Sequence, residues 1–142
     1  MSDYKTSSFK KNIKVSIEDN SVLDLVVDQI RRNIGNYSFE TGGILGGKGQ
    51  KVSRFAFDKG KKQKDEDSFC PDIDKMNNVI SNWRREEIQF LGLVHSHKVN
   101  PYLSAADIEY GFKIVLLNRM KWIYMPIYVL REDELIVYKL KM

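Results

Sequence analysis

Residues 90–107 read FLGLVHSHKVNPYLSAAD, and this stretch contains both histidines of the 142-residue chain. Its first five residues, Phe90–Val94, are apolar or glycine, which is typical of a buried β-strand. This strand leads directly into His95 and His97, and a helical pattern begins at Ser104. A buried strand, a short loop and a helix in this order indicate an α/β domain with polar residues at the end of one strand.

The two histidines are predicted to share one face of that strand. Side chains two residues apart in a strand point to the same side, so the rings of His95 and His97 can converge on one ion. Asp107 falls in the first turn of the following helix, and Asn100–Pro101 can turn the loop so that the carboxylate returns to the histidines. Two imidazole nitrogens and one carboxylate oxygen form a normal catalytic zinc shell. We therefore predict one zinc ion per chain, with His95, His97 and Asp107 as its ligands.

These residues also have structural interpretations. Ser104-Ala-Ala-Asp107 matches the pattern of a helix N-terminal capping box, which is compatible with metal binding because a first-turn side chain can serve either role. A lone histidine after a buried strand is usually structural, whereas two at positions i and i+2 favour a metal site. Nitrogen and oxygen ligands favour zinc and leave iron, manganese and cobalt as alternatives.

A carboxylate for proton transfer is available far upstream. Glu40 directly precedes the segment TGGILGG, residues 41–47. An acidic side chain before two glycines and an apolar strand can stand at the wall of a site, where the glycine backbone allows close approach. Glu40 is therefore the candidate general base and acid, and the alternative is an ordinary solvated acid beside a turn.

Together, Glu40, His95-Ser96-His97 and Ser104-x-x-Asp107 resemble the signature of the JAMM (MPN+, JAB domain) metalloproteases in their compact prokaryotic form. The resemblance implies an α/β fold: a single MPN-like, cytidine-deaminase-like domain with a mixed β-sheet flanked by helices. It also implies that His95, His97 and Asp107 bind zinc, that Glu40 activates water as general base and acid, and that Ser104 stabilises the oxyanion.

Members of this family typically hydrolyse peptide or isopeptide bonds at the C-terminus of ubiquitin or ubiquitin-like proteins. The expected partner is thus a ubiquitin-like or sulfur-carrier protein with a flexible C-terminal tail. This chain departs from the family pattern in two places. Six residues separate His97 from Ser104 where seven are usual, and Lys98 stands where a proline commonly follows the second histidine. We expect the loop to absorb the deletion.

The rest of the chain alternates strand and helix patterns without a repeat or a linker. We expect a loose tail at 1–11 and one domain over 12–142. Within this domain the patterns predict strands at 13–17, 39–45, 52–57 and 90–94. They predict helices from 20 or 21 to 34, at 72–86 and at 104–118. A glycine turn is expected at 46–49, a charged mobile loop at 58–67, and a hairpin that pairs 122–130 with 135–140 around a turn at 131–134. Ile108, Phe112, Val115 and Leu116 are expected on the inner face of the last helix.

Composition limits the class of protein. The chain is 42% hydrophobic and 30% charged, with a net charge of +4, which is ordinary for a globular domain. Its lysines are scattered, so we expect no nucleic-acid interface. No segment is apolar enough for a membrane helix or a secretory signal. Cys70 is the single cysteine, so no internal disulfide can form, which fits a cytoplasmic location.

Two other motifs are rejected as sites. Residues 42–48 fit G-x-x-x-x-G-K, but Gly49 stands where a phosphate-binding loop needs serine or threonine, and a strand pattern follows instead of a helix. Cys70 has no surrounding signature of a nucleophile and is expected to be structural. Trp83 and Trp122 are expected in the core.

The leading functional hypothesis is a zinc-dependent (iso)peptidase. The alternatives are an inactive scaffold of the same fold that binds a protein partner, and a metal-dependent hydrolase of a non-protein substrate. Inactive relatives usually lack one or more ligands, whereas all the expected residue types are present here, which favours the enzyme.

Overall fold

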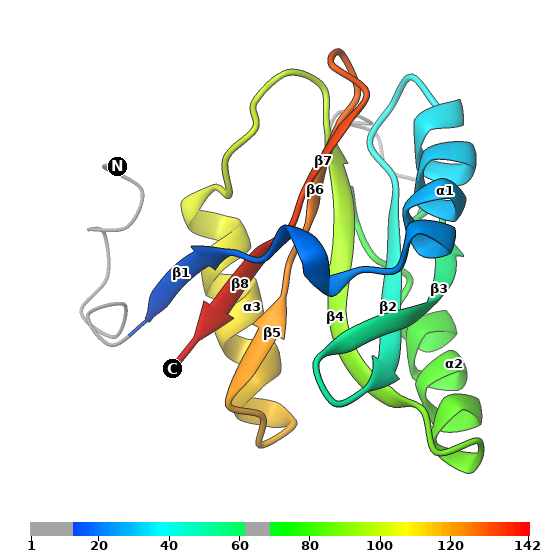
Figure 1. Ribbon diagram of the computed structural model, residues 1–142, viewed down its shortest axis with the longest axis vertical. Coiled ribbons are helices and arrows are strands. Elements are labelled where there is room, and N and C mark those ends of the chain that lie inside the picture. The colour runs from blue at the N-terminus through cyan, green and yellow to red at the C-terminus, as the bar shows by residue number, and fades with distance from the viewer. Residues whose placement is uncertain (1–12, 62–68) are drawn as a thin grey trace.

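The computed structural model describes residues 13–61 and 69–142. Over these ranges the chain is an α/β domain built on one mixed sheet, as the sequence predicted (Figure 1). Its α-helices are α1 (Asp24–Asn33), α2 (Ile73–Arg85) and α3 (Ala105–Leu117), with short 3-10 turns at Asp19–Ser21 and Ile34–Asn36. Its strands are β1 (Lys14–Ile17), β2 (Gly42–Lys48), β3 (Lys51–Asp58), β4 (Gln89–His97), β5 (Trp122–Tyr124), β6 (Ile127–Val129), β7 (Glu134–Ile136) and β8 (Tyr138–Lys141). The tail expected at 1–11, and the part of the expected loop beyond residue 61, lie outside the described residues.

Strand β4 occupies the middle of the sheet. The order is β1-β8-β5-β4-β2-β3, and β6 pairs with β4 beyond the end of β5. Strand β4 is antiparallel to β2 and parallel to both β5 and β6. The strand that ends in the histidines therefore has paired neighbours on both sides, β2 on one and β5 followed by β6 on the other.

The two faces of the sheet are covered by different helices. Helix α1 packs Val26 and Ile30 on one face, against Leu45 and Val94 of the sheet. Helices α2 and α3 cover the other face, and Figure 1 shows α3 behind β5 and β8. None of the described helices is both long enough and apolar enough to cross a membrane.

Helix α1 begins later than predicted. The expected cap at Asn20 or Ser21 is wrong, because Leu23 is the N-cap and no side chain caps the helix. Val22 pairs with Val52 as an isolated bridge, and the Leu23 N–H donates to the Val52 carbonyl at 3.0 Å. This pairing keeps the backbone extended until Leu23, so the helix cannot start before Asp24.

The glycine turn was also placed too early. Gly46 and Gly47 belong to β2, with a register shift beside them, and the turn lies at Gly49–Gln50. A Cβ on Gly46 would lie 2.7 Å from the ring of Trp83. This glycine is needed for close packing of α2 on the sheet rather than for a turn.

The C-terminal hairpin is interrupted on both sides. Its first arm splits into β5 and β6 around Met125–Pro126, and its second arm splits into β7 and β8 at Val137. Proline lacks a backbone N–H, which is consistent with the break in the ladder. The inner face of α3 was predicted correctly for Val115 but wrongly for Leu116, which is 56% exposed.

Candidate metal centre

The two histidines end strand β4 and face the side of the sheet that carries α2 and α3. On this face Gly42 of β2 is opposite His95, and Ile44 of β2 is opposite Leu93, two residues earlier in β4. The Nε2 atoms of His95 and His97 are 3.1 Å apart. The expected strand thus extends three residues beyond Val94, and the i, i+2 spacing brings both rings together as predicted.

Asp107 returns to the histidines from the first turn of α3. Its Oδ1 lies 3.2 Å from His95 Nε2, and its Oδ2 lies 3.3 Å from His97 Nε2. The six-residue spacing before Ser104 therefore does not separate the carboxylate from the imidazoles. Asn100 turns the loop, since its side-chain oxygen accepts the Tyr102 N–H at 2.9 Å, and the fully buried Leu103 anchors the loop to the core.

The three side chains form a group that could hold a metal ion. One ligand atom from each of His95, His97 and Asp107 lies within 4.8 Å of the other two. The two Nε2 atoms are 3.1 Å apart, and each lies near a different oxygen of Asp107. Two imidazole nitrogens and a carboxylate oxygen are donor types that zinc prefers.

A hydrogen bond prepares His97 to act as a ligand. Its Nδ1 lies 2.9 Å from the backbone carbonyl of Asn100. A carbonyl oxygen can only accept, so Nδ1 carries a hydrogen, and in the neutral ring this leaves the lone pair of Nε2 directed to the site. In the charged ring Nε2 also carries a hydrogen. Burial disfavours this form, but hydrogen bonds to Asp107 and to the Asn100 carbonyl favour it more strongly, so the pKa of His97 is raised.

The carboxylate of Asp107 is held in its ionised form. Burial acts to raise its pKa, but hydrogen bonds from His95 and His97 and from the Ser104 N–H together hold that pKa far below its ordinary value. A metal ligand must be deprotonated, so this environment suits a role in binding a cation.

Ser104 is both the N-cap of α3 and a neighbour of the metal centre. Its Oγ accepts the Asp107 N–H at 3.0 Å, and Asp107 Oδ2 accepts the Ser104 N–H at 3.0 Å. This is the reciprocal capping box that the sequence allowed as an alternative. The two interpretations coexist, because the capping bond orients Asp107 and does not use the hydrogen of the Ser104 hydroxyl.

Glu40 is brought to the site by the pairing of β2 with β4. In this register Gly42 is opposite His95, and continuing it by two residues puts Glu40 opposite His97 on the same face. Ser96 maintains the pairing beyond Gly42. Its N–H donates to the Thr41 carbonyl at 2.9 Å, and its Oγ accepts the Thr41 N–H at 3.0 Å. Sequence reasoning did not assign a role to Ser96.

The surroundings of Glu40 raise its pKa and so make it a weaker acid. Burial raises its pKa, and this effect exceeds the opposing influence of His97, His95 and a hydrogen bond from the Phe69 N–H. A carboxyl group with a raised pKa exchanges its proton more readily near neutral pH than an ordinary glutamate does.

Phe69 forms a roof over the site that the sequence did not reveal. Its ring lies 6.4 Å from the ring of His95 and nearly parallel to it, at 14°. A Cβ on Gly42 would lie 2.7 Å from the same ring, so glycine at position 42 leaves the space that the Phe69 ring occupies. Asp58 fixes the segment that carries Phe69: its two oxygens accept the N–H groups of Gly60 and Asp72, at 2.8 and 2.9 Å.

This arrangement corrects the prediction that the charged mobile loop begins at Asp58, which instead ends β3. The side chain is buried, with 2% of the residue exposed, because its hydrogen bonds close the base of the connection between β3 and α2. Cys70 lies in the same segment and is partly buried. Trp83 is buried as expected, whereas Trp122 is only partly buried and lies under Lys139.

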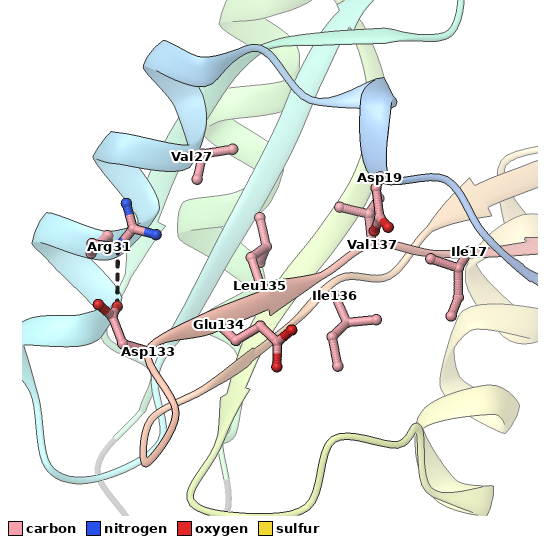
Figure 2. A pocket seen from close by; sticks show the side chains of 9 residues that line it. All are labelled: Ile17, Asp19, Val27, Arg31, Asp133, Glu134, Leu135, Ile136 and Val137. Carbon is pink, nitrogen blue, oxygen red and sulfur yellow. Dashed lines mark hydrogen bonds and ion pairs between the residues drawn. The ribbon is translucent and has the colours of Figure 1, made fainter.

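A separate pocket lies on the side of the sheet that α1 covers. Figure 2 shows it between α1 and β7, with an ion pair between Arg31 and Asp133 at 3.0 Å. It shares no residue with the metal centre and contains no histidine or cysteine. We assign it no role in the chemistry of the histidines.

Comparison with known proteins supports the architecture. No family model matches the chain, and no curated protein matches it. Among solved structures it is similar to protein DSY2949 from Desulfitobacterium hafniense, with 20% sequence identity and a TM-score of 0.62. The match covers 82% of this chain and 79% of that protein. At this identity the similarity shows a shared α/β fold and nothing about activity.

Proposed function

We propose that this chain is a zinc-dependent (iso)peptidase with the MPN fold of the JAMM family. Its substrate would be an amide bond at or near the C-terminus of a ubiquitin-like or sulfur-carrier protein. The observation that carries the proposal is the convergence of His95, His97 and Asp107, with one ligand atom of each within 4.8 Å of the other two, on the face where the strand register brings Glu40.

The chain supplies a zinc shell with one coordination position left for water or substrate. His95 and His97 offer imidazole nitrogens, Asp107 offers an ionised carboxylate, and the Asn100 carbonyl holds the His97 ring in the required tautomer. Zinc bound there would act as a Lewis acid that polarises the scissile carbonyl and makes water a stronger nucleophile at neutral pH.

Proton transfer is assigned to Glu40. Its carboxylate accepts a proton from the attacking water and then delivers that proton to the nitrogen of the departing amine as the carbon–nitrogen bond breaks. The raised pKa of Glu40 suits both halves of this cycle. The Ser104 hydroxyl, which keeps its hydrogen while accepting the Asp107 N–H, donates to the oxygen of the scissile carbonyl as negative charge develops there.

The roof residue Phe69 supports Glu40 and limits access of water. Its backbone N–H donates to the Glu40 carboxylate and its ring covers His95. Electrostatic interactions are stronger where bulk water is displaced, so this segment acts as a positioning element for the general base.

Two measurements on the same proteins test the proposal. Elemental mass spectrometry should find about one zinc per chain in the wild type and in Glu40→Gln, and little in His97→Ala, because only the histidine is a ligand. Purified ubiquitin-like and sulfur-carrier proteins with C-terminal extensions should be trimmed by the wild type, as measured by intact mass. Glu40→Gln should lose this activity, at least a hundredfold, since the general base is removed.

Glu109→Gln is the matched control, because Glu109 is an exposed carboxylate on α3. It should retain both zinc and activity. A wild-type chain that takes up no zinc after reconstitution would refute the metal centre. Zinc uptake without cleavage of any extended substrate would refute the peptidase and favour the scaffold.

A further inference from the structure

A second feature of the metal centre is an apolar pocket that opens beside it. The pocket has a volume of about 270 Å³ and lies between β4, the first half of α3 and the segment that carries Phe69. Its floor consists of the buried side chains of Met76, Leu93 and Met125, and its rim includes the exposed Ala106. Apolar groups line most of it, so it favours an apolar occupant.

The pocket is continuous with the predicted site of chemistry. His95 and Asp107, two of the three candidate ligands, are also part of its wall. Any group seated in the pocket therefore lies next to the position at which an amide would be held for hydrolysis. The pocket is smaller than those that bind drug-sized ligands, which measure about 300–1,000 Å³. A cavity of about 150 Å³ already holds a benzene ring, so one side chain is an appropriate occupant.

One polar group in the wall lacks a partner within the described residues. The hydroxyl of Tyr110 is buried and has no hydrogen-bond partner there. A buried donor without an acceptor costs free energy, which a ligand with an acceptor can recover. The peptide carbonyl adjacent to a seated side chain is such an acceptor.

We propose that this pocket determines substrate specificity by binding the side chain of a residue that flanks the scissile bond. This side chain is apolar and of leucine or phenylalanine size, and the Tyr110 hydroxyl donates a hydrogen bond to the adjacent peptide backbone. This pocket proposal rests on the proposed peptidase function and adds a requirement on the substrate sequence beside the cut bond. A tail that consists only of glycine at the cut would leave the pocket unfilled, so the preferred substrate carries an apolar residue beside the bond.

Methyl NMR of the protein with labelled methionine tests the pocket without requiring zinc or catalysis. Met76 and Met125 line the pocket, while Met120 and Met142 lie outside it and serve as internal references. N-acetyl-leucinamide should shift the Met76 and Met125 methyl signals in a saturable manner, and N-acetylglycinamide should not, because it has no side chain to bury.

Two variants connect the shifts to the pocket. Ala106→Trp places a large ring at the rim and should abolish the response to the leucine probe, while Lys113→Trp, at an exposed position later on α3, should leave it intact. Tyr110→Phe removes the hydroxyl and should weaken binding about three- to tenfold, the usual effect of one hydrogen bond.

The pocket proposal is overturned if no methyl responds, if the glycine probe acts equally, or if the response persists in Ala106→Trp. A failure of the peptidase proposal would be seen separately, as absence of zinc or of cleavage, while these methyl shifts depend only on the pocket walls.

Discussion

Ser96 connects two parts of the site that are far apart in the chain. It lies between the two histidines, and strand alternation directs its side chain to the face opposite the metal centre. Its N–H donates to the Thr41 carbonyl, and its Oγ accepts the Thr41 N–H. The residue is fully buried, so no water can replace these bonds. Ser96 therefore keeps Glu40 in register with His97 while the flanking imidazoles face the candidate metal centre.

Ser96→Ala should separate positioning of the base from metal binding. It removes the acceptor for the Thr41 N–H, so the free energy of unfolding should fall by about 1–3 kcal/mol. Zinc content should stay near one per chain, because His95, His97 and Asp107 are unchanged, while cleavage should fall sharply as Glu40 loses its register. Ser81→Ala, at an exposed position of α2, should change stability by about 0.5 kcal/mol or less. Equal stability of the two variants in urea unfolding would contradict the role of Ser96.

At the scale of elements, the site is assembled at the ends of several segments. Strand β4 contributes the histidines, the first turn of α3 contributes Asp107, and the connection between β3 and α2 contributes the Phe69 roof. The capping box fixes the start of α3, and the two hydrogen bonds of Asp58 fix the base of that connection. Hydrogen bonds outside the site therefore fix the start of α3 and the base of the connection between β3 and α2.

Asp58→Asn tests the two hydrogen bonds of Asp58, which together form the Asp58 clamp. The amide can accept only one of the two N–H groups that the carboxylate accepts, so a buried charged hydrogen bond is lost and the free energy of unfolding should fall by about 2–3 kcal/mol. The amide proton signal of Gly60 or Asp72 should move upfield as its bond is lost. Asp74→Asn, an exposed change in the first turn of α2, should cost about 0.5 kcal/mol. Unchanged amide signals in the Asp58 variant would show that the clamp does not operate in solution.

For the whole molecule, the candidate metal centre lies between the central strand and the helix layer. His95 and His97 come from β4 and Asp107 comes from α3, so an ion bound by all three would cross-link the sheet to α3. An ion that binds the folded state and not the unfolded state stabilises the fold in proportion to its affinity.

Chelation should therefore lower the melting temperature. Free zinc at about a thousandfold above its dissociation constant contributes about 4 kcal/mol, which corresponds to about 10 °C in a domain of this size. Calorimetry before and after treatment with a chelator should show this decrease in the wild type, and readdition of zinc should reverse it. His97→Ala should melt at the same temperature in both conditions. A wild type that is indifferent to the chelator would argue against a stabilising ion.

Local patterns in the sequence determined the elements that include the candidate ligands. The apolar run before His95, the spacing of the histidines and the Ser104–Asp107 cap all act within one strand or one helical turn, so they could be interpreted without knowledge of the fold. For the same reason the α2 and α3 boundaries were predicted within one residue. Errors arose where distant partners decided the outcome, as when Val52 delayed α1 and Trp83 required glycine inside β2.

Only the tertiary structure decided how the remote parts meet. The register of β2 on β4 positions Glu40, the Asp58 clamp brings Phe69 over His95, and the packing of α3 on the sheet leaves the Tyr110 hydroxyl at the wall of an apolar pocket. The physical reason is that strand register and helix packing depend on which buried surfaces fit together across the whole chain. The sequence by itself determined the chemical types of the ligands, and long-range pairing determined what surrounds them.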